Sequence, residues 1–110
     1  MKVHLIKKQS IEGYVGRNAQ SKVPFGIWLS IIRRADWNEP SDIIATFNSA
    51  DILGSGSERV VFNIGGNKYR MICKYNFGRA RVHLFVMWIG THAAYTKLCN
   101  GGKQYTVSDY

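Results

Sequence analysis

The residue best suited to acid–base chemistry in this chain is His92, which follows Thr91 at the expected start of a helix. With Thr91 as the N-cap, His92 falls in the first helical turn, beside backbone N–H groups that have no partner within the helix. Such a helix start binds phosphate groups, and its positive end disfavours the charged imidazolium. A neutral imidazole accepts protons, so the pattern predicts an acid or base that acts near a phosphate. The alternative is a structural histidine.

Positive charge gathers on three β-rich segments that precede His92, at residues 60–64, 67–77 and 80–89. Because side chains alternate between the two faces of a strand, the expected register separates apolar residues from cations. We expect the core face to carry Val60, Phe62, Ile64, Tyr69, Met71, Cys73, Val82, Leu84, Val86 and Trp88. We expect the opposite, uncovered face to carry Arg59, Asn63, Lys68, Arg70, Lys74, Arg81 and His83, mixed with Val61, Ile72, Phe85 and Met87.

The second of these faces carries no acidic residue after Glu58. A solvated outer face usually mixes charges of both signs, so we interpret this one as an anion-binding face, with a solvated face as the alternative. The whole chain has 15 Lys and Arg residues against 7 Asp and Glu, a formal net charge of +8. This excess suits a polyanionic partner, either nucleic acid or an acidic protein, although it also serves solubility.

The length and composition suit one small folded domain over residues 1–110, with residues 100–110 as a possible extended tail. No apolar run reaches the roughly 18 residues that span a bilayer, and the apolar stretch near the N-terminus is too short for a secretory signal. Cys73 and Cys99 lack the spacing of a zinc site and are too few for a disulfide scaffold. We therefore expect a reduced, cytoplasmic setting and no metal or other cofactor.

The elements around these strands predict an α+β fold, an antiparallel sheet with helices on one face. We expect a strand over residues 3–6, a helix from the N-cap Ser10 to about Ala19, and a second helix capped by Ser21. Its core-facing stripe would be Val23, Ile27, Trp28, Ile31 and Ala35. A short helical piece follows over residues 40–47. Two-residue turns at Gly65-Gly66 and Gly78-Arg79 connect the three strands, and a short last helix starts at His92.

Several sequence blocks resemble the HigB family of type II toxin–antitoxin systems. Residues 60–70 have the sequence VVFNIGGNKYR, and residues 90–95 have the sequence GTHAAY. The stretch Trp37-Asn38-Glu39-Pro40-Ser41-Asp42 matches the family's W-x-x-P-x-D pattern, and Ser49-Ala50-Asp51 follows it. The resemblance runs from about Trp28 to Tyr95. Members of this family resemble RelE and ParE toxins in fold, with a twisted antiparallel sheet and helices on one face, in agreement with the expected layout.

The resemblance implies an mRNA interferase, an endoribonuclease that usually cuts messages in the ribosome and so inhibits translation and growth. It implies a HigA-type helix-turn-helix antitoxin as partner, with operator DNA bound only through the toxin–antitoxin complex. The family's basic positions fall on Lys68 and Arg70, and its THxxY motif falls on Thr91, His92 and Tyr95. The family commonly has Asp directly after this Tyr, where the present chain has Thr96.

The chemistry that fits these residues is metal-free RNA cleavage by the ribose 2′-OH. It needs a base, an acid for the leaving 5′-oxygen, and cations that stabilise the phosphorane. On this hypothesis His92 is the acid or base, Arg70 stabilises the phosphate, Lys68 adds charge or transfers a proton, and Tyr95 positions the substrate or shares the proton transfer. Arg59, Lys74 and Arg81 would bind the RNA backbone, and the ring of Phe85 would stack on a base.

Two other functions remain open on the same scaffold. A ParE-like toxin acts by binding DNA gyrase without cleaving RNA, and fold alone does not distinguish the two. The basic face and His92 favour the ribonuclease, since gyrase binding requires neither. A non-catalytic RNA-binding module would expose several aromatic rings for stacking, whereas this face offers only Phe85.

Overall fold

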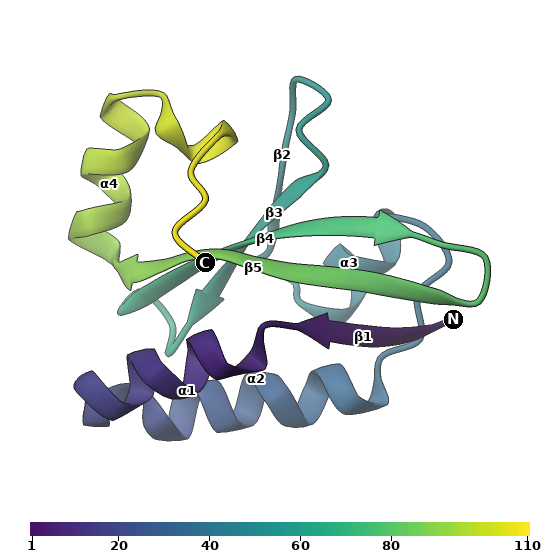
Figure 1. The fold of residues 1–110 in the computed structure, drawn as a ribbon, viewed down its shortest axis with the longest axis horizontal. Coiled ribbons are helices and arrows are strands. Elements are labelled where there is room, and N and C mark those ends of the chain that lie inside the picture. Colours follow the sequence, from purple (N-terminus) through teal and green to yellow (C-terminus); the bar gives the residue numbers. More distant parts are fainter.

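The computed structural model describes residues 1–110 and contains a five-stranded sheet with helices on both of its faces (Figure 1). Its elements are β1 (Lys2–Ile6), α1 (Lys8–Arg17), α2 (Lys22–Arg34), α3 (Ser41–Thr46), β2 (Asp51–Leu53), β3 (Arg59–Ile64), β4 (Tyr69–Phe77), β5 (Arg81–Thr91) and α4 (His92–Asn100), with short 3₁₀ helices at Ala19–Ser21 and Lys103–Tyr105. The strand order is β1-β5-β4-β3-β2. The α+β class is confirmed. None of the helices combines the length and the apolar character that a membrane span requires.

The direction of β1 is the first difference from the expected sheet. Strands β2 to β5 pair antiparallel, but β1 runs parallel to β5, from Lys2 opposite Arg81 to Ile6 opposite Phe85. The sheet is therefore mixed. A tight turn sets the direction of a hairpin strand, whereas β1 is followed by two helices that return the chain to the same end of the sheet. Its direction therefore depends on how those helices pack.

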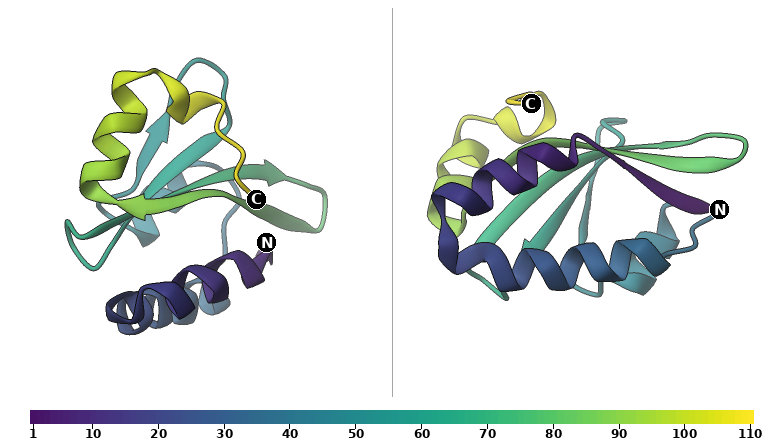
Figure 2. Two further views of the ribbon diagram at one scale, coloured as in Figure 1. Left: turned by 60° about the vertical axis from the view of Figure 1, so that its left-hand side comes forward. Right: turned by 60° about the horizontal axis from the view of Figure 1, so that its bottom comes forward.

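Helices α1 and α2 cover one face of the sheet, while α4 and the C-terminus lie on the other (Figure 2). The main core joins both helices to the inward residues of β3, β4 and β5. Helix α2 buries Phe25, Trp28 and Ile32, while Val23 and Ile27 are 70% and 58% exposed, so the expected stripe is rotated. Helix α1 also begins earlier than expected, after Lys7 in a left-handed conformation.

Both hairpin turns are longer than the two residues expected. The β3–β4 loop spans residues 65–68, so Ile64 pairs with Tyr69, and Phe77 pairs with Val82 across the second turn. Gly65 and Gly66 adopt positive φ values of 64° and 68°, conformations that glycine takes without strain. Each register differs from the expected one by two residues. Because side chains alternate with a period of two, the side chains keep their predicted faces up to a bulge in β5.

This β-bulge corrects the expected place of Trp88. Val86 pairs with Cys73 and Trp88 pairs with Ile72, so β5 has one extra residue, Met87, between them. Beyond this residue the alternation of β5 reverses. Ile89 therefore joins the main core, and Trp88 joins a second cluster beneath α4, on the face where the sequence predicted cations. That face is not uncovered, because α4 and the C-terminal segment (residues 101–110) cover part of it.

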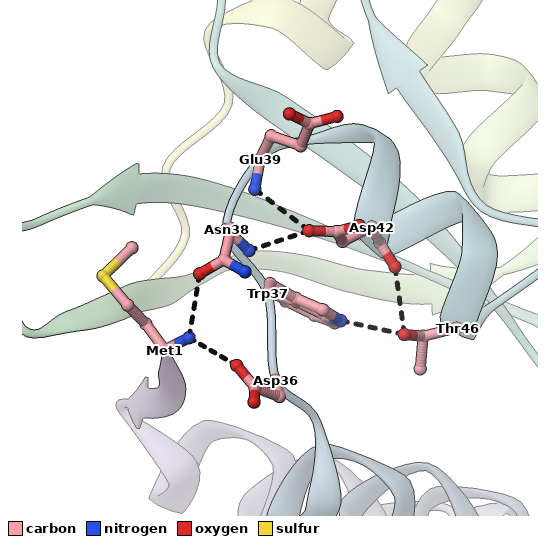
Figure 3. Close-up of polar contacts among 7 residues, drawn as sticks. All are labelled: Met1, Asp36, Trp37, Asn38, Glu39, Asp42 and Thr46. Carbon is pink, nitrogen blue, oxygen red and sulfur yellow. Dashed lines mark hydrogen bonds and ion pairs between the residues drawn. The ribbon is translucent and has the colours of Figure 1, made fainter.

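The W-x-x-P-x-D stretch has a structural role in this fold (Figure 3). The Asp42 carboxylate accepts hydrogen bonds from the backbone N–H groups of Asn38 and Glu39, at 2.8 and 3.2 Å. The Trp37 side chain is fully buried, and its Nε1 donates to the Thr46 hydroxyl at 2.9 Å. The Met1 amino group hydrogen-bonds to Asp36 and lowers the pKa of that carboxyl below its ordinary value. These contacts hold α3 and the chain before it against Met1, at the start of β1.

Candidate functional site

The four residues predicted as catalytic come together where β4 begins, β5 ends and α4 starts. Tyr69 pairs with Thr91 and Arg70 with Gly90, and the backbone N–H of His92 donates to the carbonyl of Lys68 at 3.0 Å. This last bond ties the β3–β4 loop to the first turn of α4. We call Lys68, Arg70, His92 and Tyr95 the catalytic cluster because the sequence predicts them to be catalytic, and the pairing of two neighbouring strands assembles it.

His92 is the first residue of α4 and is exposed to solvent. Thr91 is its N-cap, as predicted, because its side-chain oxygen accepts a hydrogen bond from the backbone N–H of Ala94 at 3.2 Å. The Thr96 hydroxyl donates to the carbonyl of His92 at 3.2 Å, so it bonds within α4 at the position where the family commonly has Asp. The imidazole therefore lies at the positive end of a capped helix. The side chain of Lys68, whose backbone carbonyl accepts the hydrogen bond from His92, is also exposed.

Arg70 is buried, with only 7% of its surface exposed. Its guanidinium donates to the carbonyls of Tyr69 and Gly66, at 3.1 and 3.5 Å, and to the side-chain oxygen of Asn67 at 3.4 Å. All three acceptors are neutral, and Arg70 forms no ion pair. Arg70 therefore holds the β3–β4 loop in shape while its positive charge stays unneutralised. The sequence reasoning did not assign a role to Asn67.

Tyr95 lies on α4, one turn after His92, with its ring centre 6.0 Å from that of Trp88. Burial, then the Cys99 side chain and the negative charge of Asp51, raise the pKa of Tyr95 far above its ordinary value, while Arg70 opposes this shift. The phenol therefore stays protonated at neutral pH. It can donate a hydrogen bond or a proton, but it cannot serve as a base.

Trp88 and Gly90 support the site, and the sequence reasoning missed both roles. A Cβ atom on Gly90 would lie 2.5 Å from two ring carbons of Trp88, so the indole needs a glycine at this position. The Trp88 ring packs in the second cluster with Leu53, Val61 and Ile72, against Ala94, Tyr95 and Leu98 of α4. This packing holds α4 on the sheet and so sets where Tyr95 lies.

The residues predicted to bind the RNA backbone separate into two groups, and Arg59 forms the first of them. It is 6% exposed and donates to the carbonyls of Gln104 and Val107 in the C-terminal segment, at 3.2 and 2.7 Å. Burial lowers the pKa of Arg59, because it disfavours the charged form. This placement does not support contact with RNA, and we assign Arg59 to holding the C-terminal segment.

Lys74, Phe85 and Arg81 form the second group, on the uncovered part of the same sheet face. Lys74 pairs with Phe85, and both line a hollow of about 390 Å³ together with Lys7, Asn76, Met87, Ser108 and Tyr110. Arg81 lies further along β5, opposite Lys2. The C-terminal segment crosses between this group and the catalytic cluster, where the N–H of Asp109 donates to the carbonyl of Met87 at 2.9 Å. The basic face is therefore divided into two separate parts.

The fold, with N-terminal helices on one face of the sheet and a short C-terminal helix, has the layout expected of RelE-like toxins. Residues 21–98 match the HigB toxin family, described as the RelE-like toxic component of a toxin–antitoxin system. The chain therefore belongs to the HigB toxin family, as the sequence blocks indicated, and its partner in such a system is an antitoxin. The chain is similar to the mRNA interferase HigB of Escherichia coli O6:H1 (strain CFT073), with 27% identity over 96 residues, which covers 87% of this chain and 91% of that protein.

The different placement of two neighbouring cations leads to a stability prediction. Arg59 and Lys74 face each other across β3 and β4, but only Arg59 is buried and bonded to the C-terminal segment. We expect Arg59→Met to lower the free energy of unfolding by about 2 kcal/mol, since it leaves two carbonyls without their charged donor. The matched change Lys74→Met should alter it by less than about 0.5 kcal/mol. Urea denaturation followed by circular dichroism measures both, and equal losses would contradict this assignment.

Proposed function

We propose that this toxin is an endoribonuclease that cleaves mRNA without a cofactor, by attack of the ribose 2′-OH on the adjacent phosphate. The observation that carries the proposal is the meeting of an exposed histidine at a helix start, an exposed lysine and a protonated tyrosine in one cluster. The printed function of the E. coli relative, mRNA interferase, supports the same activity. We take residues 1–110 as a single toxin domain.

Each member of the catalytic cluster has a proposed part in the reaction. His92 accepts the proton of the 2′-OH, whose oxygen then bonds to phosphorus. The bond from phosphorus to the 5′-oxygen breaks, and Lys68 donates the proton that the leaving oxygen takes up. Tyr95 donates a hydrogen bond to a phosphate oxygen, and the unneutralised charge of Arg70 stabilises the phosphorane. The products are a 2′,3′-cyclic phosphate and a 5′-hydroxyl.

The shape of the site supports a message that is held by the ribosome. None of the three hollows on the surface is lined by a residue of the catalytic cluster. Enzyme sites for small substrates are usually concave, and orientation of the substrate adds to the rate, so a second surface that orients the message would favour cleavage here. We propose that the ribosome supplies this surface, in the cytoplasm, and that a HigA-type helix-turn-helix antitoxin inhibits the toxin. Operator DNA would be bound only through the complex of the two proteins.

The role of His92 is tested by induction of the wild type and His92→Ala in a bacterial host, followed by growth measurement and mapping of mRNA ends. The wild type should arrest growth and fragment messages, and His92→Ala should cleave about 10²- to 10⁴-fold more slowly. Lys97→Ala, which removes another exposed side chain of α4, is the matched control and should behave like the wild type.

Two outcomes would contradict the proposal. Arrest by the wild type with intact messages would favour a ParE-like toxin that binds gyrase, and DNA supercoiling would then change. Fragmentation by His92→Ala at the wild-type rate would keep the activity but remove His92 from the chemistry.

The protonated state of Tyr95 leads to a prediction on the pH dependence of cleavage. Because its pKa is raised, the phenol stays neutral from pH 6 to about pH 9, and its ionisation should not shape the pH–rate profile there. Tyr95→Phe keeps the ring against Trp88 but removes the hydrogen-bond donor. We expect it to lower the cleavage rate by about tenfold, with an unchanged profile, since one hydrogen bond is worth about 1.4 kcal/mol. An alkaline limb that disappears in Tyr95→Phe would show that the phenol ionises in this range.

A further inference from the structure

Four basic side chains, Lys2, His4, Arg81 and His83, form a group at the opposite end of the sheet from the catalytic cluster. The N-terminus lies beside the turn between β4 and β5 (Figure 1). There a hollow of about 410 Å³ is lined by Lys2, Val3, His4, Ala80 and Arg81. Lys2 pairs with Arg81 and His4 pairs with His83, so these four side chains lie on the same sheet face as the catalytic cluster.

The two histidines of this group contact each other edge to face, with ring centres 5.8 Å apart. The Nδ1 atom of His83 is buried and has no hydrogen-bond partner among the protein atoms. Unpartnered buried polar atoms are rare in folded proteins and need an explanation, and a bound ion is one. The centre of the His83 ring lies 6.5 Å from the centre of the Phe85 ring, and Phe85 lines the hollow beside Lys74.

The charge of this group is not neutralised by ion pairs. Lys2 and Arg81 are exposed and form none. The acid nearest to Lys2 along the strand pairing is Asp36, whose carboxylate is bound by the Met1 amino group. Lys2, Arg81 and the imidazole of His4 therefore line a hollow whose lining contains no carboxylate, and His83 lies next to His4. This arrangement attracts an anion such as a phosphate group.

We propose that Lys2, His4, Arg81 and His83, here called the distal site, bind a backbone phosphate of the RNA several nucleotides from the cleaved bond. This inference rests on the proposed function. Strand β5 links the two sites, and the seven steps from His83 to Gly90 span about 23 Å at 3.3 Å per residue. Lys74 and Phe85 lie between them on the same face, and supply a cation and a ring for the intervening RNA.

RNA accounts for the distal site better than a free anion does. A free phosphate would use the hollow alone and would give no role to Lys74 and Phe85 along the same face. The C-terminal segment separates the distal site from the catalytic cluster. A short RNA bound at the catalytic cluster therefore does not reach the distal site, whereas a long RNA contacts both. The affinities of short and long RNAs can be compared.

The experiment uses the His92→Ala variant of the 110-residue protein, which should cleave RNA slowly enough for binding to be measured. Two labelled single-stranded RNAs of about four and about sixteen nucleotides serve as probes, within the usual range of site sizes. The test variant adds Lys2→Gln and Arg81→Gln, two exposed positions. Arg79→Gln, in the β4–β5 turn next to the hollow but not lining it, is the matched control. Fluorescence anisotropy at several salt concentrations gives the affinities, and circular dichroism checks the fold.

We expect the double change to weaken binding of the long RNA by about tenfold or more, and to reduce its salt slope by about 0.7, the value for one lost phosphate contact. Binding of the short RNA and the affinities of Arg79→Gln should stay within about twofold of the parent protein. An equal loss for both RNAs, or no loss, would overturn the proposal. The proposal would also be overturned if binding of inorganic phosphate or of an acidic peptide depended on Lys2 and Arg81 while binding of the long RNA did not.

This outcome is independent of whether the protein cleaves RNA. A length-dependent loss of binding in a protein that cuts no message would keep the distal site and refute the nuclease. Cleavage by the wild type with no effect of Lys2→Gln and Arg81→Gln on long RNA would refute only the distal site.

Discussion

The candidate site depends on one backbone hydrogen bond, from the N–H of His92 to the carbonyl of Lys68. It closes the pairing of β4 with β5 and joins the β3–β4 loop to the start of α4. Lys68 and Arg70 lie on one side of this junction, and His92 and Tyr95 on the other. The β-bulge at Met87 adds the second requirement, because it turns Trp88 towards α4 and so gives that helix an apolar surface to rest on. Without both features, the four side chains would lie on separate parts of the surface.

Local patterns were enough to predict that Lys68, Arg70, His92 and Tyr95 lie near one another. The capping threonine, the alternation along the strands and the glycines of the β3–β4 loop each act over a few residues, and an error of two in the register leaves the faces unchanged. The remaining errors come from long-range packing. Nothing in the composition of β5 marks the one extra residue that reverses Trp88. The burial of Arg59 depends on where the C-terminal segment folds, and the direction of β1 depends on two helices.

Dividing the basic face into two parts changes the interpretation of the charge of this toxin. A uniform basic surface would bind any polyanion along its length. Here the C-terminal segment and α4 leave the catalytic cluster at one end and an open group of cations at the other. An exposed site gains from a substrate that is oriented from outside, which fits our proposal that the ribosome holds the message. Arg70 has two roles in this account, since its guanidinium holds the β3–β4 loop in shape and also supplies positive charge.

The measurement that tests the central claim most directly is cleavage of a message in which the nucleotide before the cut carries a single 2′-deoxyribose. The purified toxin acts on this message and on its all-ribose counterpart, both free and in programmed ribosomes, and the ends are mapped at that position. If the ribose 2′-OH is the nucleophile, the all-ribose message is cut there to a 2′,3′-cyclic phosphate and a 5′-hydroxyl, and the substituted one is not. Equal cleavage of both messages would contradict the mechanism and the assignment of the catalytic cluster.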